Sequence, residues 1–593
     1  MSHILSAEAL SDFITPGVAC IKPIETLPIA PPPPSPSDTL AHEVILDDGR
    51  PPPPPPGAAA PTQISLTDCL ACSGCVTSAE AVLVSLQSHA EVLDTLDAAP
   101  ALRLRGPDAA AGRYAVEGGE DDDDGKSRLF VASVSPQVRA NLAAACGGGV
   151  TERQAGWMLQ RLLAGDEGLA AGGRFGNRFA WVVDTNVARE ACLVLGSDEV
   201  LSLSGPSAAA PSKPILTSSC PGWVCYAEKT HPHVLSHLSK VKSPQALTGT
   251  LLKASLSRAL GIPPGRIWHL SIMPCFDKKL EASREELTDS VWAGGDDMSG
   301  RGVRDVDCVI TSKEILMLTE SRGIDFFGLS TSPISQQVPF PDPVMQQFLF
   351  PSRGGRQPSQ AAGSSGGNLH FILQDALQRY PGSTVQATRG RNADMIEYVL
   401  HSASGEPLFK AARYYGFRNI QNLVRRLKPP QPSRMPGGKP FGSARRHTSK
   451  AAGMDYAYVE VMACPGGCNN GGGQIKVDDP VIIHRKGLAS KPGPQEQKDW
   501  LARVDEAYFS ADDSEVEGDA NSGNGIGDGL DDVEGISPSY IRDTLAHWAG
   551  ASGIDLDRLV YTSYREVISD VGKAKAGDGD AVSRLVGRVD GGW

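Results

Sequence analysis

The sequence predicts an α/β fold in which helices cover parallel β-strands. Short apolar segments rich in β-branched residues recur along the chain, segments with helical character follow them, and cysteines come directly after several of the expected strands. Strands that alternate with helices are typical of parallel sheets. Ligands bind such sheets beyond the carboxyl ends of the strands, so we expect these cysteines to gather in one place.

The expected elements begin at residue 128. The segment "RLFVASVS" predicts a buried strand, and "PQVRANLAAAC" predicts a helix that begins at Pro136, because proline suits the first helical position. A helix is also expected after Ser243, its N-cap, up to Gly261. The segment 179–195 repeats the strand–helix pattern, and further strands are expected at 213–219, 266–274, 305–312 and 456–463.

Other segments of the 593-residue chain have the composition of solvated, disordered insertions. They are proline-rich (31–56), acidic (117–125 and 510–535), rich in serine and glycine (351–367), or proline-rich and basic (428–450). Such segments cannot bury enough apolar surface to fold. We therefore predict an N-terminal segment (1–125), an α/β domain (126–490) and a small helical C-terminal region (491–593).

Composition excludes several classes of protein. A net charge of −13 argues against direct nucleic-acid binding, which needs a basic face. No run of 18 apolar residues predicts a membrane span, and the N-terminus lacks the pattern of a secretory signal. We therefore expect a cytoplasmic protein, with the basic segment 428–450 as a feature that would suit a nuclear location as well. In a reducing compartment, 12 cysteines predict metal ligands and buried thiols rather than disulfides.

The first cysteine group lies near the N-terminus. "DCLACSGC" places Cys69, Cys72 and Cys75 at C-x2-C-x2-C spacing, which favours an iron–sulfur cluster over zinc, although four cysteines would also suit zinc. The fourth cysteine of the usual ferredoxin run is absent, and Cys20 is the other cysteine of this region.

The second group combines three segments. "TSSCPGW", "MPCFDKKLEA" and "VMACPGGCNNGGGQ" contribute Cys220, Cys275, Cys464 and Cys468, again four potential thiolate ligands. Neighbouring prolines stiffen these loops, and the glycines allow close approach of the backbone to a bulky cofactor. Trp223 is expected to pack beside the site. The other cysteines of the α/β domain are interpreted as packed thiols: Cys146, Cys192, Cys225 and Cys308.

These three segments resemble the signature motifs of iron-only hydrogenases, in the same order, over roughly residues 126–490. The resemblance implies a hydrogenase-like α/β domain in which Cys220, Cys275, Cys464 and Cys468 hold a 4Fe-4S cluster. In that family the cysteine matching Cys468 also bridges to a di-iron unit, and the lysine matching Lys278 contacts that unit.

One position departs from the family pattern. Active hydrogenases carry a proton-relaying cysteine where this chain has Ser219. A serine hydroxyl has a much higher pKa than a thiol and is a poorer proton relay near neutral pH. We therefore predict a protein that is not an enzyme and lacks hydrogenase activity.

The N-terminus, "ILSAEALSDFITPGVACIKP" with "ISLTDCLACSGC", resembles the eukaryotic hydrogenase-like proteins of cytosolic iron–sulfur protein assembly, the nuclear-architecture-related or nuclear prelamin A recognition factor-like family. The resemblance implies that Cys20 completes a second 4Fe-4S site with Cys69, Cys72 and Cys75. It also implies a role between an early scaffold complex and a targeting complex with a WD-repeat protein, which serves cytosolic and nuclear apo iron–sulfur proteins.

Two alternatives remain open from the sequence. The chain could be an active iron-only hydrogenase, which Ser219 opposes, or a structural protein associated with the nuclear envelope, for which the basic segment is the sole support. The terminal Trp593 has two interpretations, a chance residue on a tail or a docking anchor whose ring and carboxylate bind the targeting complex.

Overall fold

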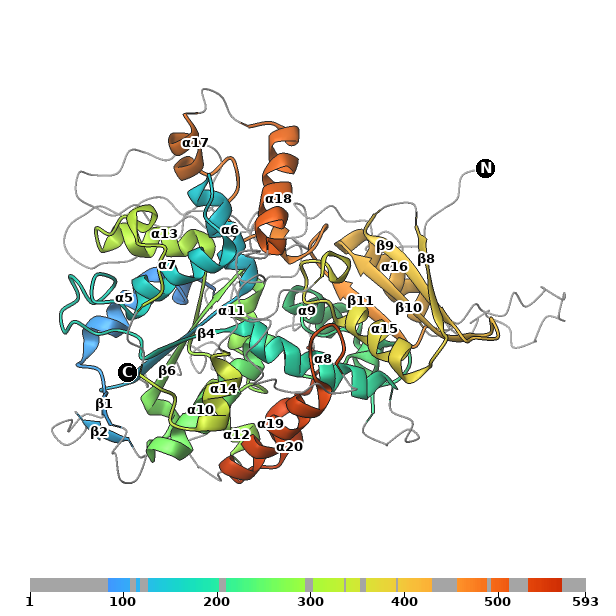
Figure 1. Cartoon of the computed structure of the whole chain (residues 1–593), viewed down its shortest axis with the longest axis horizontal. Helices are drawn as coiled ribbons and strands as arrows, with labels where there is room; N and C mark the ends of the chain where they lie inside the picture. The colour runs from blue at the N-terminus through green and yellow to red at the C-terminus, as the bar shows by residue number, and fades with distance from the viewer. Residues whose placement is uncertain are drawn as a thin grey trace, which may run out of the picture.

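The computed structural model describes residues 84–106, 114–117, 126–201, 210–293, 302–334, 338–351, 359–390, 393–428, 456–487, 492–510 and 532–567. Two sheets, each covered by helices, form two adjoining lobes (Figure 1). The longer helices are α5 (His89–Ala98), α6 (Pro136–Cys146), α7 (Glu152–Ala164), α8 (Thr185–Leu201), α9 (Pro221–Thr230), α10 (Pro244–Leu260), α13 (Ser312–Ser321), α15 (Asn368–Arg379), α16 (Phe417–Leu427), α18 (Pro494–Phe509) and α19 (Pro538–Ser552). The shorter ones are α11 (Asp277–Ala282), α12 (Asp289–Trp292), α14 (Pro343–Leu349), α17 (Pro480–Lys486) and α20 (Leu556–Val560), with 3-10 turns η1 (Pro232–His237), η2 (Pro264–Arg266), η3 (Phe326–Gly328), η4 (Gln360–Ala362) and η5 (Cys468–Asn470).

The first sheet is wholly parallel, in the order β4 (Trp181–Asp184), β3 (Leu129–Val134), β6 (Ile267–Met273), β7 (Cys308–Thr311). Alternate residues of β3 enter different cores because side chains alternate along a strand. Val131 packs with residues of α8, α10 and α19 on one face, whereas Ala132 packs with residues of α6, α7 and α18 on the other. Both faces are therefore buried, as parallel sheets require.

The second sheet is mixed, in the order β5 (Ile215–Leu216), β11 (Tyr458–Met462), β10 (Pro407–Tyr415), β9 (Met395–His401), β8 (Thr384–Arg389). The first three strands are parallel to one another, and β8, β9 and β10 run antiparallel in succession. Helices α9 and α16 cover one face of this sheet, and α15 covers the other. A separate ribbon pairs β1 (Arg103–Arg105) with β2 (Ala115–Glu117).

The predicted α/β class and each of the strands expected from residue 128 onwards are confirmed. The helix after Ser243 has the expected caps, since the Ser243 side chain accepts from the Ala246 amide and Gly261 adopts the left-handed conformation with φ +66°. The antiparallel strands β8, β9 and β10 were not expected. Most residues of β8 are exposed, and most residues of β9 are only partly buried. The continuous apolar runs that predicted the other strands are therefore missing here.

The prediction that 351–367 is a solvated loop is wrong for 362–367, which is largely buried, whereas 359–361 are exposed. Ser364 and Ser365 are buried, and the Ser364 carbonyl accepts a hydrogen bond from the Gln137 side chain at 2.9 Å. Composition was misleading because small residues suit a tightly packed turn as well as a solvated loop.

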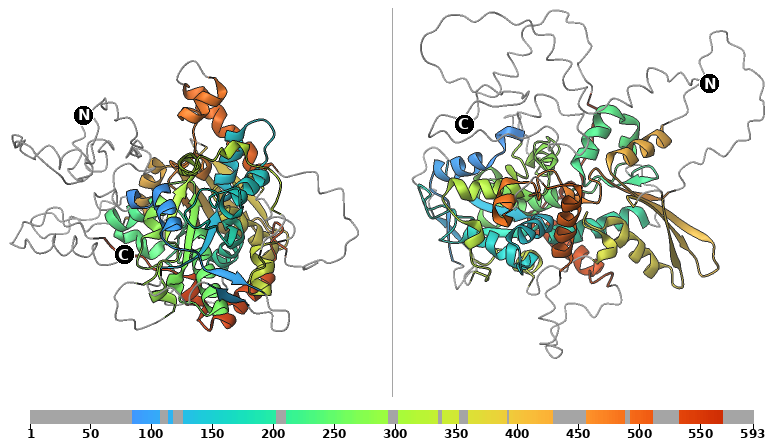
Figure 2. Two further views of the ribbon diagram at one scale, coloured as in Figure 1. Left: turned by 90° about the vertical axis from the view of Figure 1, so that its left-hand side faces the viewer. Right: turned by 90° about the horizontal axis from the view of Figure 1, so that it is seen from above.

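Helices from beyond residue 490 pack onto the first lobe. Trp500 of α18 donates to the Ile475 carbonyl in the core that contains α6, and Trp548 of α19 lies in the core with α8 and α10. Figure 2 shows α18 beside α6 from two further directions. Among the described residues, no helix combines the length and apolar character that crossing a membrane would need.

Candidate functional site

The second cysteine group lies on loops that follow three parallel strands. Cys220 comes after β5 and is the N-cap of α9, Cys275 comes after β6 and precedes α11, and Cys464 comes directly after β11. Strands β5 and β11 belong to one sheet and β6 to the other, and α9 contacts α11 between the two lobes (Figure 1). The site is thus assembled where the carboxyl ends of both sheets meet.

The four thiols influence one another. Burial, and after it the charge of Cys468, raises the pKa of the Cys220 thiol to about 12. Burial also raises the pKa of Cys464 well above its usual range, and Cys468 and Cys275 are the next largest contributors. As whole residues, all four cysteines are partly rather than fully buried. The structure therefore brings the four sequence-predicted cysteines into one neighbourhood.

The thiols do not converge on a point. Within the described ranges, no group of three or more His, Cys, Asp or Glu side chains is close enough to hold a single metal ion. A cubane cluster has a different requirement, because each cysteine binds a separate iron at a corner of the cube.

Two serines support the loop of Cys464 and Cys468. The Cys468 amide donates to Ser365 Oγ at 3.0 Å, which fixes the backbone of this cysteine. Gly467 has φ +104°, and a Cβ there would come within 2.7 Å of Ser364 Oγ and 2.9 Å of Ser365 Oγ. This glycine was expected to leave room for a cofactor, but serine side chains fill the room beside its Cα. Sequence reasoning missed both serines, which no local motif marks.

A second contact joins this loop to the Cys275 loop. The Gly473 amide donates to the Pro274 carbonyl at 3.0 Å, and a Cβ on Gly471 would approach the same carbonyl oxygen to 2.3 Å. Only glycine permits this approach of two backbones. The glycine-rich run therefore holds two cysteine loops in register.

Lys278 brings a positive charge to this cysteine group and is held in a hydrogen-bond network. Its ammonium donates to the Ser219 carbonyl at 3.1 Å and to Glu281 Oε2 at 2.9 Å. The same Glu281 oxygen accepts from Ser243 Oγ at 3.0 Å and from Gln245 Nε2 at 3.0 Å. The charge of Lys278 also lowers the pKa of Cys275 and Cys468, although burial outweighs it.

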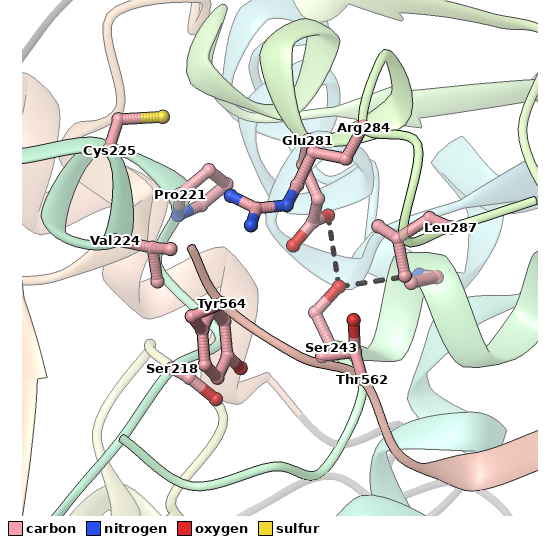
Figure 3. A pocket seen from close by; sticks show the side chains of 11 residues that line it. Ser218, Pro221, Val224, Cys225, Ser243, Glu281, Arg284, Leu287, Thr562 and Tyr564 are labelled. Carbon is pink, nitrogen blue, oxygen red and sulfur yellow. Dashed lines mark hydrogen bonds between the residues drawn. The ribbon is translucent and has the colours of Figure 1, made fainter. Parts of the chain in front are cut away.

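A small cavity lies beside this network (Figure 3). It is lined by residues that include Ser218, Glu281, Arg284 and Tyr564, and its volume is about 20 Å³. That is room for about one water molecule.

Two further residues lie near the cysteine loops: Asp277, which the sequence analysis did not single out, and Trp223, which it did. Asp277 is buried, and burial raises the pKa of its carboxyl to about 8, with Oδ1 lacking a hydrogen-bond partner. Trp223 was expected beside the site. Its side chain is 1% exposed, donates to the Thr217 carbonyl at 3.1 Å, and shares a core with Cys220.

The cysteines that were interpreted as packed thiols differ in burial: Cys192 and Cys308 are buried, whereas Cys146 and Cys225 are only partly buried.

The first cysteine group and the C-terminal residue lie outside the described residues: Cys20, Cys69, Cys72, Cys75 and Trp593. The described chain nevertheless begins at Val84, nine positions after Cys75, and Val84 packs against Phe276 and Leu280. Gln87 bonds to the Lys279 carbonyl at 3.0 Å. The chain that leads from the triplet therefore joins the protein at α11, next to Cys275.

Comparison with known proteins shows the family to which this chain belongs. The family model described as "Iron only hydrogenase large subunit, C-terminal domain" matches residues 128–472. The chain is 65% identical to "Cytosolic Fe-S cluster assembly factor nar-1" of Neurospora crassa over 595 residues, with 100% of both chains covered. It is 64% identical to the factor of the same description in Chaetomium globosum and 61% to that of Botryotinia fuckeliana, again with full coverage.

Solved structures of FeFe-hydrogenases are also similar. HydA1 from Chlamydomonas reinhardtii aligns with a TM-score of 0.49 at 21% identity, and the alignment covers 81% of this chain and 99% of that chain. A structure on stepwise H-cluster assembly gives 0.48 at 21% identity with the same coverage. The family model and the full-length relatives, rather than these structures, carry the assignment.

Proposed function

Because this chain belongs to the iron-only hydrogenase-like family that includes the cytosolic Fe-S cluster assembly factors of these fungi, we propose that it helps deliver clusters to cytosolic and nuclear iron–sulfur proteins. It would act as a binding protein that holds two 4Fe-4S clusters and works in the cytoplasm, with a nuclear location as well. The resemblance drawn from the cysteine motifs agrees with this membership.

One observation carries the proposal: four thiols on three strand-end loops share one buried neighbourhood. Burial raises the pKa of the Cys220 and Cys464 thiols, and Cys468 contributes to both shifts, so these side chains lie close to one another inside the protein. Four thiolates there would repel one another unless a cationic centre compensated their charge. The donor set therefore fits a 4Fe-4S cluster held by Cys220, Cys275, Cys464 and Cys468. The cluster would supply a redox-active or transferable iron–sulfur unit.

The surroundings support a role other than hydrogen turnover. Ser219 offers a hydroxyl, and a serine hydroxyl does not exchange protons readily near neutral pH. Lys278, which the hydrogenase resemblance would assign to a di-iron unit, is bound to Glu281 and to the Ser219 carbonyl. We propose that the chain carries no di-iron unit.

The second cluster would be held by Cys20, Cys69, Cys72 and Cys75. Support comes from the triplet spacing and from the family, whose members match this chain over its full length. The described chain begins at Val84, nine positions after Cys75, and Val84 packs against Phe276 and Leu280, which supports a second cluster near the first. Such proximity would suit electron exchange between the two.

The direct test is chemical analysis of the full chain purified without oxygen. We expect about eight iron and eight acid-labile sulfide per chain, and paramagnetic resonance signals of two reduced cubanes. Stoichiometric zinc with little sulfide would overturn the cluster assignment. Infrared bands of metal-bound carbonyl and cyanide, or hydrogen evolution, would instead identify an active hydrogenase.

Cellular depletion separates the assembly role from the structural alternative. Loss of the chain should lower the activity of cytosolic aconitase-type enzymes while the nuclear envelope stays intact. An altered envelope with normal enzyme activities would favour the structural role.

Partners follow from the same proposal: an early scaffold complex, a targeting complex that contains a WD-repeat protein, and apo iron–sulfur proteins. Trp593 would dock on the targeting complex through its ring. Deletion of Trp593 should leave the iron content unchanged and weaken binding to that complex by about thirtyfold. Equal binding would make the tryptophan a chance terminal residue.

A further inference from the structure

The segment 561–567, which we call the latch, follows α20 and crosses from the first lobe to the second. Leu559 of α20 lies in the core of the first lobe together with residues of α10. Beyond this helix the chain is extended, and the Thr562 amide donates to the Lys240 carbonyl at 2.8 Å. The latch therefore starts from the first lobe and is attached by its backbone to the connection between η1 and α10.

The latch is held on the second lobe by Glu228, a residue of α9 that is 4% exposed. The Arg565 amide donates to Glu228 Oε1 at 3.1 Å, and the Val567 amide donates to the Glu228 carbonyl at 3.0 Å. The same carboxylate accepts from both terminal nitrogens of Arg284, at 2.8 and 2.5 Å. Arg284 follows α11, which contacts β7 of the first lobe. Glu228 is thus a buried point at which two segments of the first lobe meet the second lobe.

Tyr564 joins the latch to the loop of Cys220. Its ring packs against the core of the second lobe, and its hydroxyl donates to the Ser239 carbonyl at 2.8 Å. Ser218 Oγ, two positions before Cys220, donates to the same carbonyl oxygen at 2.7 Å. A carbonyl oxygen has two lone pairs, so it can accept both hydrogen bonds. The latch and the cysteine loop therefore share one anchoring atom.

The cavity drawn in Figure 3 lies between the latch and the cysteine loop. Tyr564 lines it from the latch, and Ser218 and Pro221, which stand on either side of Cys220 in the sequence, line it from the loop. The volume of about 20 Å³ leaves room for about one water molecule. The latch is therefore a layer of side chains directly outside the loop that carries Cys220.

From these contacts we propose that the latch keeps the seam between the lobes closed over the Cys220 site. While it is bound to Glu228 and Ser239, it holds the lobes together beside the four thiols; its release allows the seam to open and exposes them. The inference rests on the proposed function in one respect, because the group that the closed seam would retain is the 4Fe-4S cluster.

The contacts of the latch differ in weight. Tyr564→Phe removes the buried hydrogen bond to Ser239 and keeps the ring, so we expect local opening to become about fivefold more frequent. Arg565 also pairs with Glu285 and Glu286, but its side chain is 58% exposed, and exposed ion pairs contribute little. Arg565→Gln should therefore change the opening less than twofold, since its backbone amide still binds Glu228.

Hydrogen exchange of the full chain, followed by mass spectrometry, measures the opening with or without a bound cluster. Amides of 216–226 should exchange about fivefold faster in Tyr564→Phe than in the unaltered chain, whereas those of α7 should keep their rates. Tyr398→Phe, a partly buried tyrosine of β9, is the matched control and should leave both segments unchanged. Unchanged exchange of 216–226 in Tyr564→Phe, or an equal acceleration in α7, would overturn the proposal.

Iron loss tests the consequence for the cluster. In the Cys20→Ala background the remaining iron would belong to the Cys220 site, and an excess of bathophenanthroline disulfonate without oxygen measures its release. We expect release to be about fivefold faster with Tyr564→Phe and little changed with Arg565→Gln. Equal release in all three proteins would overturn the role of the latch in retaining the cluster. A chain without iron would contradict the proposed function instead, and hydrogen exchange would still decide whether the latch closes the seam.

Discussion

The ammonium nitrogen of Lys278 lies 3.1 Å from the backbone carbonyl oxygen of Ser219. This contact joins α11, which follows Cys275, to the loop that ends in Cys220. Glu281 completes the arrangement as the counter-charge of Lys278, and both side chains are almost wholly buried. A single lysine thus couples two cysteine loops and places a positive charge near the four thiols.

Replacement of Lys278 by methionine should therefore have two effects. Glu281 would be left as an uncompensated buried charge, which should reduce the free energy of unfolding by about 3 kcal/mol. The reduction potential of the neighbouring cluster should become more negative, because a nearby cation stabilises the reduced, more negatively charged state. Thermal unfolding and a potentiometric titration followed by paramagnetic resonance measure the two.

The double variant Lys278→Met with Glu281→Gln serves as the control. It removes both charges, so much of the lost stability should return, and the potential should move back towards that of the unaltered chain because the nearby anion is lost as well. A Lys278→Met protein with unchanged potential would show that the lysine does not lie near a cluster.

The cysteine sites should differ in their effect on folding. Cys464→Ala should lose about half of the iron and melt at a lower temperature, because its ligand lies where two sheets meet and metal binding there contributes to folding. Cys20→Ala should lose the other half with little change in the melting of the α/β domain.

Cys146→Ala is the matched control, since Cys146 is a partly buried thiol at the end of α6 outside the site. Its iron content should equal that of the unaltered chain. If Cys464→Ala and Cys20→Ala melted alike, the first cluster would not be part of the core.

Gly467 should not tolerate a side chain. Gly467→Ala combines a left-handed φ of +104° with a Cβ 2.7 Å from Ser364 Oγ, so we expect a loss of about 3 kcal/mol and a lower iron content. Gly261→Ala tests the backbone effect by itself, because Gly261 has φ +66° with nothing within 4 Å of the added Cβ. Its cost should be about 1 kcal/mol with the full iron content. Equal losses in the two variants would mean that the serines do not confine Gly467.

The free energy of unfolding should decrease on acidification because His269 binds a proton more readily in the unfolded chain. Burial lowers the pKa of this histidine from 6.5 to about 4, and its Nδ1 faces the Asp305 carbonyl at 3.1 Å while Nε2 faces Ser133 Oγ at 2.8 Å. Between these two pH values the unfolded chain binds a proton that the folded chain does not, so stability decreases as the pH falls. From pH 7 to pH 5 this group should account for a loss of about 2 kcal/mol.

This contribution is measured by urea unfolding at pH 7 and at pH 5 of three proteins: the unaltered chain, His269→Gln and His401→Gln. The His269 variant should show a smaller dependence on pH. His401 lies on the more exposed strand β9, so its replacement should leave the dependence unchanged. An unchanged slope in His269→Gln would assign the acid sensitivity to other groups.

The strands and helices that carry the site could be predicted because local sequence is sufficient for them. β3, β6 and β11 are buried on both faces and therefore appear as continuous apolar runs, and α10 carries its own N-cap and terminal glycine. The cysteines follow such strands directly, so the topology of a parallel sheet made their meeting at one edge a reasonable expectation.

What the sequence by itself determined was thus the α/β class, the succession of the main elements and the four cysteines of the strand ends. Only the tertiary structure decided that these cysteines lie between two sheets, that Ser364 and Ser365 support Cys468 from about a hundred residues away, and that Lys278 pairs with Glu281 and Ser219. The physical reason is that such contacts join segments distant along the chain, whereas periodicity and capping report only the conformation of neighbouring residues.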